Sequence, residues 1–208
     1  GALRAHAAAY RDMLRTDSAP RLLDIVYTAS ARRSHYVHRL SVVGRTKHEL
    51  AEQLDAYLQG HGSTGVAEGK ASPARAKIVF VFSGQGSQWL GMGRQLYESD
   101  ASFRSVIDTC DNLMTSRLGW SILDELDAPE TMSRINDTQV AQPLLFAVQV
   151  ALVEMLRSWG ISPDAMIGHS VGEIAAAHIA GILSLDEAIR LVAIRGRIMQ
   201  KATGMGKM

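Results

Sequence analysis

The pentapeptide Gly168-His169-Ser170-Val171-Gly172 sets a serine between two glycines. It matches Gly-x-Ser-x-Gly, a turn that lifts a nucleophilic hydroxyl from a strand end to a helix start. The flanking apolar run and small-residue stretch supply that strand and helix. Glycines keep side chains away from the tight turn, and free N–H groups at the helix start stabilise a developing oxyanion. The sequence predicts Ser170 as a nucleophile and the N–H of Val171 as an oxyanion donor; the alternative is a tight turn holding a small polar residue.

A second glycine-rich loop, Gly84-Gln85-Gly86-Ser87-Gln88, follows five consecutive apolar residues, 78–82. Such a run is typical of a strand covered on both faces. The loop lacks the lysine of a phosphate-binding P-loop and the Gly-x-Gly-x-x-Gly spacing. If the two strands are parallel, their carboxyl ends share one sheet edge, where ligands bind. We therefore expect this loop to face Ser170; the alternative is a plain turn between a strand and a helix.

An arginine falls on the apolar face of the helix expected over 184–202, which opens with Ser184 and Glu187 in capping-box spacing. Arg195 lies in the middle of that face, made by Ala188, Leu191, Val192 and Met199, with Arg190, Arg197 and Lys201 opposite. A buried guanidinium needs an anionic partner. Two partners stay open: a structural salt bridge, or a substrate carboxylate held by two N–H groups.

The elements that position these residues form two regions. Residues 1–60 predict a small α/β unit with helices over 2–14 and 47–60 and a strand within 36–46. Residues 61–76 are rich in Gly, Ser and Ala and predict a linker. From residue 77 strands alternate with helices, which favours a parallel α/β sheet. The clearest helix covers 142–160, with Pro143 expected in its first turn and Gly160 closing it.

The composition and net charge of the chain argue against some classes of function, nucleic-acid binding and membrane binding among them. The chain has 208 residues, 47% of them hydrophobic, and a formal net charge of +1, which gives no field to attract nucleic acid or an anionic membrane. Its single cysteine, Cys110, cannot form an internal disulfide. We expect no apolar segment long enough to cross a bilayer, and the first residues of the chain show no signal-peptide pattern. We expect a cytoplasmic protein without a metal or bound cofactor.

Four motifs in order, FSGQGSQWLGMG, TQVAQPLLFA, IGHSVGEIAAAHIAG and AIRGRIMQ, resemble the acyltransferase domain of modular polyketide synthases and the malonyl-CoA:acyl-carrier-protein transacylases. Residues 1–60 similarly resemble the adaptor between the ketosynthase and the acyltransferase of such synthases. The resemblance implies an α/β fold: a small α/β linker domain, then the N-terminal part of a parallel-sheet, α/β-hydrolase-like acyltransferase subdomain over 77–208.

The resemblance also implies roles. Ser170 would be acylated by an acyl-CoA and then deacylated by the phosphopantetheine thiol of an acyl carrier protein. The N–H groups of Gln85 and Val171 would form the oxyanion hole. Arg195 would pair with the free carboxylate of a malonyl unit, and Gln142 and His169 would line the substrate site, with the His169 ring directed away from Ser170. The branched residue after the serine favours malonyl over methylmalonyl.

In this family the general base is a histidine far downstream of the serine, beyond a ferredoxin-like subdomain, and neither is expected in this chain. After Ser170 the only histidine is His178, which we interpret as a packing or surface residue. The partners implied are a ketosynthase, the carrier protein and the downstream remainder of the acyltransferase. Two other classes stay open: a serine hydrolase of the α/β-hydrolase type, which has no use for Arg195, and a non-catalytic docking fragment.

Overall fold

The computed structural model describes residues 1–72 and 76–202, and the chain divides into two compact units, Gly1–Ala76 and Lys77–Met208. Each unit has its own hydrophobic cluster. The predicted boundary at residue 77 agrees with this division. Residues 73–75 of the predicted linker and 203–208 of the predicted acyltransferase region lie outside the described residues.

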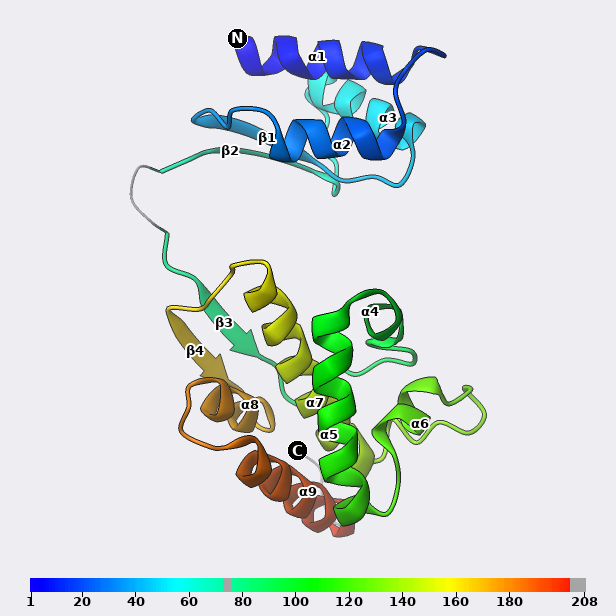
Figure 1. Cartoon of the computed structure of the whole chain (residues 1–208), viewed down its shortest axis with the longest axis vertical. Helices are drawn as coiled ribbons and strands as arrows, with labels where there is room; N and C mark the ends of the chain where they lie inside the picture. Colours follow the sequence, from blue (N-terminus) through cyan, green and yellow to red (C-terminus); the bar gives the residue numbers. More distant parts are fainter. Residues whose placement is uncertain (73–75, 203–208) are drawn as a thin grey trace. The chain divides into compact units, whose positions relative to one another are not determined.

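The first unit packs three helices with a two-stranded antiparallel sheet (Figure 1). Its elements are α1 (Ala2–Leu14), α2 (Leu22–Ala31), β1 (His38–Val42), α3 (Lys47–Gln59) and β2 (Val66–Lys70). The Thr46 side chain caps α3 by accepting from the N–H of Glu49, and Gly60 ends it with a φ of 82°, as glycine at this position allows. The two predicted helices and the predicted strand are confirmed.

Part of the predicted linker is instead strand β2. Its register pairs Val66 with Val42 and Lys70 with His38, and the N–H of Val43 extends the ladder to the carbonyl of Gly65 at 2.8 Å. Four of its five residues are exposed, so the strand is held by backbone hydrogen bonds rather than by burial. Its composition therefore resembles that of a linker although its backbone is ordered.

The second unit is built around one long buried helix, α7 (Thr138–Ser158), which contacts α5, α6, α8 and α9 (Figure 1). The other elements are β3 (Val79–Phe82), α4 (Arg94–Ser99), α5 (Ala101–Leu118), α6 (Ile122–Asp127), β4 (Ala165–Gly168), α8 (Gly172–Ile179) and α9 (Leu185–Lys201). Strands β3 and β4 are parallel, with Phe82 opposite Gly168, as the alternation of strands and helices predicted. The carboxyl ends of both strands therefore meet at one edge.

The expectation that the strand over 78–82 is covered on both faces is wrong for this chain. Phe82 is buried, but Val81 is 73% exposed, and Ile167 on β4 is 58% exposed. Successive side chains of a strand point to opposite faces, and in the described part of this unit helices cover only one of them. The run over 78–82 is apolar on both faces of the strand, but the described residues cover only the face that carries Phe82.

Helix α7 begins earlier than predicted, at Thr138, so Pro143 lies inside the helix rather than in its first turn. A proline there removes the N–H that would bond to the carbonyl of Gln139, one turn before it. Gly160, with a φ of 79°, follows the end of the helix as expected.

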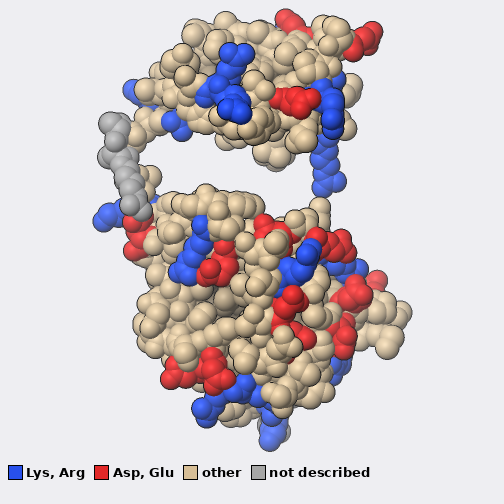
Figure 2. Space-filling view, in the orientation of Figure 1, with Lys and Arg blue, Asp and Glu red and all other residues tan. Residues whose placement is uncertain are grey.

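The expectation that no segment could cross a bilayer also needs correction. Helix α7 is long and apolar enough by length and composition, with a mean hydropathy of 1.5 in its window. However, 78% of that window is buried inside the fold, as in the central helix of a packed core. Figure 2 shows acidic and basic side chains interspersed over the visible face of each unit.

Candidate active site

Ser170 adopts the strained backbone of a nucleophile elbow. Its φ is 55°, the only positive value among the described residues other than glycine. The two flanking glycines are required by space: a Cβ on Gly168 would lie 2.4 Å from the Cα of Glu173, and one on Gly172 would lie 2.3 Å from the carbonyl oxygen of Phe82. The close approach of α8 to the end of β3 therefore depends on glycine at both positions. A strained serine held this way at the start of a helix is typical of a functional site.

The glycine-rich loop after β3 lies directly against this elbow, as predicted. A Cβ built on Gly84 would lie 2.7 Å from Nδ1 of His169 and 3.1 Å from Cβ of Ser170. The N–H of His169 donates to the carbonyl of Phe82 at 3.0 Å, which continues the β3–β4 pairing into the elbow. Within the described residues, the N–H groups of Gln85 and Val171 donate no hydrogen bond. Both predicted oxyanion donors are thus free to bind a ligand oxygen.

Arg195 lies in this site and contacts the serine. Its guanidinium donates through one nitrogen to Oγ of Ser170 at 2.9 Å and through the other to Oε1 of Gln142 at 2.6 Å. Gln142 is fully buried, and its Nε2 donates to Oε1 of Gln85 at 3.2 Å. The structure brings together Ser170, Arg195, Gln142 and Gln85, all of which the sequence selected.

No carboxylate in the described part of the chain pairs with Arg195, since its bonds go to a hydroxyl and an amide. A half-buried guanidinium with neutral partners is poised to bind an anion, because a charge removed from water gains most from an opposite charge. Of the two partners left open by the sequence, the structural salt bridge is therefore absent from the described residues.

The buried face of α9 differs from the predicted one. It consists of Ala188, Ile189, Val192, Ala193 and Gly196, whereas Leu191 is 46% exposed. Helix α9 approaches α7 closely at Gly196, where a Cβ would lie 3.2 Å from the Cα of Gln139. This contact rotates α9 so that Arg195 lies at the edge of the buried face, beside the site. The capping box of Ser184 and Glu187 is confirmed, and its hydrogen bonds lower the pKa of Glu187.

Two residues that the sequence analysis missed also contact the glycine-rich loop. Thr138 accepts a hydrogen bond from Nε2 of Gln85 at 3.1 Å, and Gln149 donates to the carbonyl of Ser83 at 2.8 Å. Both belong to α7. The signal was their spacing: they lie one turn before and two turns after Gln142, so three polar side chains share one face of a mostly apolar helix.

Neither histidine of the second unit, His169 or His178, hydrogen-bonds to Ser170 in the described structure. His169 is exposed, and its ring lies against Gly84. Nδ1 of His178 is 3.0 Å from the carbonyl oxygen of Leu183, and its ring contacts Phe146 with centroids 6.2 Å apart. The prediction of a packing role for His178 is confirmed. The described residues hold no group of three His, Cys, Asp or Glu side chains that could bind a metal.

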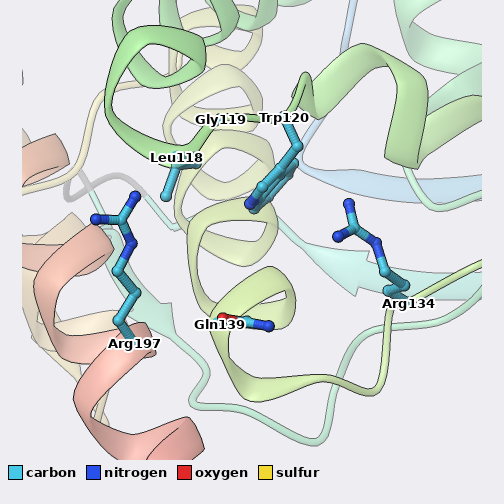
Figure 3. A pocket seen from close by; sticks show the side chains of 6 residues that line it. All are labelled: Leu118, Gly119, Trp120, Arg134, Gln139 and Arg197. Atoms are coloured by element: carbon cyan, nitrogen blue, oxygen red, sulfur yellow. The ribbon is translucent and has the colours of Figure 1, made fainter.

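A cavity of about 300 Å³ lies apart from the predicted site residues (Figure 3). It is lined by Leu118, Gly119, Trp120, Arg134, Gln139 and Arg197. Arg134 pairs with the buried carboxylate of Glu125, and Arg197 donates to the carbonyl of Arg117 at the end of α5. Arg134 is thus neutralised by a carboxylate, whereas Arg197 has a neutral partner but is exposed to solvent. Among the described residues, the cavity therefore holds no buried, unpaired charge that would select a ligand.

The geometry described so far is a strained serine beside an arginine without a carboxylate partner among the described residues, at the edge of a parallel strand pair, and it fits an acyl-transferring α/β protein. A family model described as acyl transferase domain matches residues 79–208. The chain belongs to this acyl transferase domain family. A second model, described as CurL-like, PKS C-terminal, matches residues 1–54.

The chain is similar to large polyketide synthases. It is 40% identical over its whole length to the spectinabilin polyketide synthase system protein NorA′ of Streptomyces orinoci, and 39% identical to an erythronolide synthase of Saccharopolyspora erythraea. In each case it covers 6% of the synthase. Among solved structures, the acyltransferase domain from module 8 of the salinomycin polyketide synthase is 36% identical, with a TM-score of 0.84 over 96% of this chain.

The match to that solved structure covers 47% of its length, so the chain spans about half of the acyltransferase it resembles. The malonyl-CoA:ACP transacylase of Synechocystis sp. PCC 6803 is 33% identical, with a TM-score of 0.55 over 62% of this chain and 42% of that one. Both likenesses are to α/β acyltransferase structures, and the predicted fold class is confirmed.

Proposed function

We propose that this chain carries the acylation half of a polyketide synthase acyltransferase site, which transfers a malonyl-type unit from coenzyme A to a carrier protein. The observation that carries the proposal is the contact of Arg195 with Oγ of Ser170 at 2.9 Å, with no carboxylate in the described part of the chain to neutralise the arginine. A nucleophile and an unpaired cation side by side fit a substrate that has both a thioester and a free carboxylate.

In the proposed reaction, Oγ of Ser170 attacks the thioester carbonyl of malonyl-CoA. The new C–O bond forms as the serine proton passes to a base outside this chain, which gives a tetrahedral oxyanion that the N–H groups of Gln85 and Val171 stabilise. The C–S bond then breaks, and coenzyme A receives the proton from the base and leaves as its thiol. Arg195 binds the malonyl carboxylate, and Gln142 orients Arg195 through the bond from its guanidinium at 2.6 Å. The phosphopantetheine thiol of an acyl carrier protein then gives its proton to the base and attacks the serine ester. A new C–S bond forms, the C–O bond to Ser170 breaks, and Oγ of Ser170 recovers the proton.

The preference for malonyl over methylmalonyl rests on the branched residue after the serine. Val171 is fully buried and packs in the core beneath the elbow, so its side chain would act by shaping the turn rather than by touching the substrate. A competition between equal amounts of malonyl-CoA and methylmalonyl-CoA tests the preference, with excess malonyl adduct as the expected result. Equal amounts of the two adducts would show that the chain does not prefer malonyl-CoA.

The first unit is proposed as the adaptor to a ketosynthase, and the remainder of the acyltransferase is the proposed source of the general base. The match of residues 1–54 to a polyketide synthase model supports the first of these. The open face of the β3–β4 sheet, with Val81 73% exposed, supports the second, because a parallel sheet is normally covered on both faces.

Product analysis distinguishes transfer from hydrolysis. The acylated chain, together with the downstream half of the domain, is mixed with a carrier protein bearing phosphopantetheine, and both products are followed by mass. A transferase yields malonyl carrier protein, and a carrier protein whose serine lacks phosphopantetheine is the matched control. Free malonate as the main product in both samples would favour the serine hydrolase instead.

A further inference from the structure

Gln149 connects the core helix to the end of strand β3. Its Nε2 donates to the carbonyl of Ser83 at 2.8 Å and lies 3.3 Å from the Ser83 hydroxyl. Its Oε1 is buried and has no hydrogen-bond partner in the described structure. A buried acceptor left without a partner destabilises the fold, and an apolar side chain of similar size would avoid that cost. A glutamine that carries this cost on a mostly apolar helix indicates a role for its donor group.

The carbonyl that Gln149 binds lies against the nucleophile elbow. A Cβ on Gly172 would be 2.7 Å from the carbonyl oxygen of Ser83, so this oxygen touches the first turn of α8. Ser83 is also the residue before the Gly84–Gln85 peptide, whose N–H faces Ser170 in the proposed mechanism. The Ser83 carbonyl belongs to the planar Ser83–Gly84 peptide, so fixing it fixes the position of Gly84, from which the Gly84–Gln85 peptide starts. The hydrogen bond from Oγ of Ser87 to the Gly84 carbonyl then orients that second peptide.

The rest of the loop is held by bonds within itself. The hydroxyl groups of Ser83 and Ser87 are 2.8 Å apart, and Oγ of Ser87 donates to the carbonyl of Gly84 at 3.2 Å. The N–H of Gly86 donates to the side chain of Gln88 at 2.8 Å. These bonds shape the loop, whereas the bonds from Gln149 and from Gln142 and Thr138 on the same helix tie it to the core. Gln149 acts on the end of the loop that leaves strand β3.

We propose that Gln149 is a positioning residue, which holds the Ser83 carbonyl so that the N–H of Gln85 points to the oxyanion formed at Ser170. The inference rests on the proposed function, in which Gln85 supplies an oxyanion donor. Gln142 and Gln149 lie seven residues apart on one rigid helix, so α7 aligns the arginine and the oxyanion loop together.

The test compares two substitutions at this position with one matched control. Gln149→Met keeps the length of the side chain and removes the donor, and Gln149→Glu keeps the shape but faces the Ser83 carbonyl with an acceptor. Gln139→Met makes the same chemical change on the same helix, at a side chain that lines the cavity of Figure 3. For each variant we would measure acylation by malonyl-CoA in single turnover, amide hydrogen exchange over residues 83–88, and thermal unfolding.

The proposal predicts that Gln149→Met lowers the maximal acylation rate about 5- to 20-fold, while the half-saturating malonyl-CoA concentration changes less than about twofold. Exchange over residues 83–88 rises, exchange in α7 and α8 does not, and Gln149→Glu has the larger effect. Gln139→Met matches the wild type in rate and exchange.

Unchanged rate and loop exchange in both Gln149 variants would overturn the proposal. Faster exchange throughout α7 with a lower unfolding temperature would assign Gln149 a purely structural role and would also overturn it. If the wild type is not acylated even with the downstream half of the domain added, the proposed function fails, and the exchange data still decide whether Gln149 holds the loop. Should the Met variant not fold, the isosteric Glu variant decides in the same way.

Discussion

Arg195 donates a hydrogen bond to Oγ of Ser170 at 2.9 Å, so the cation of helix α9 lies on the hydroxyl of the nucleophile elbow. The same guanidinium is held by Gln142, a fully buried side chain of α7. Helix α7 and the serine turn, two segments far apart in the sequence, therefore meet at the guanidinium of Arg195 on α9. A malonyl carboxylate would replace the Ser170 hydroxyl as the partner of Arg195, which would free the serine oxygen to attack.

The first prediction concerns this arginine. Arg195→Met should lower the rate of Ser170 acylation by malonyl-CoA about 100-fold, because the loss of a partner for a desolvated carboxylate costs about 2–5 kcal/mol. Acylation by acetyl-CoA, which has no free carboxylate, should fall much less. The measurement is single-turnover mass spectrometry with both thioesters. Arg190→Met, on the exposed side of α9, is the control. Equal losses with the two substrates would show that Arg195 does not bind the carboxylate.

The second prediction concerns the elbow glycines. Gly172→Ala would place a methyl group 2.3 Å from the carbonyl oxygen of Phe82, and relief requires α8 to move away from β3. We expect the free energy of unfolding of the second unit to fall by about 1–3 kcal/mol or more, as for other overpacked positions. Denaturant titration measures the loss. Gly69→Ala, where nothing lies within 4 Å, is the matched change, and equal stability of the two variants would contradict the close approach.

The two faces of strand β3 give the third prediction. Phe82 is 4% exposed and Val81 is 73% exposed, although they are neighbours in the same apolar run. Phe82→Ala should lower the free energy of unfolding by about 3–5 kcal/mol, and Val81→Ala by less than about 0.5 kcal/mol. Equilibrium unfolding of this chain compares them directly. A similar loss in both variants would mean that the second face of the sheet is covered in this chain.

Cys110 provides the fourth prediction. It is fully buried on α5, and burial raises the pKa of its thiol to about 12. Because the thiolate is the reactive form, almost none is present at pH 8, and the raised pKa keeps the thiol protonated across the neutral range. Iodoacetamide should leave the native chain unlabelled and label it once denaturant unfolds the second unit. Labelling of the native chain at the rate of a free thiol would show that the core around α5 is open.

The sequence was sufficient to predict the elements that carry strong local signals. The capping box at Ser184, the glycine that ends α3 and the Gly-x-Ser-x-Gly turn are set by residues close together in the chain, and each is found in the structure. The hydrogen bonds of Arg195 to Ser170 and Gln142 could not be predicted from the sequence, because they depend on how helix α9 packs in the folded chain. The position of α9 depends on close packing at Gly196 against α7, which no periodicity along α9 indicates.

Two errors have the same physical origin. Strand β2 forms through backbone pairing with β1, and its side chains are mostly exposed, so its composition resembles a linker. Strand β3 is apolar on both faces, yet the described residues cover only one. In both cases the side-chain pattern of a strand shows only which side chains could be buried. Whether a strand finds a partner or a covering layer depends on other segments, which the pattern does not describe.

If Ser170 is a nucleophile in a site that binds a malonyl thioester, malonyl-CoA should acylate it. The decisive experiment is intact-mass measurement of this chain after incubation with malonyl-CoA, beside Ser170→Ala. We expect one malonyl adduct on the wild type and none on the variant, with the downstream half of the domain added if the base is needed for a measurable rate. An adduct on both chains, or none on either after that half is added, would contradict it.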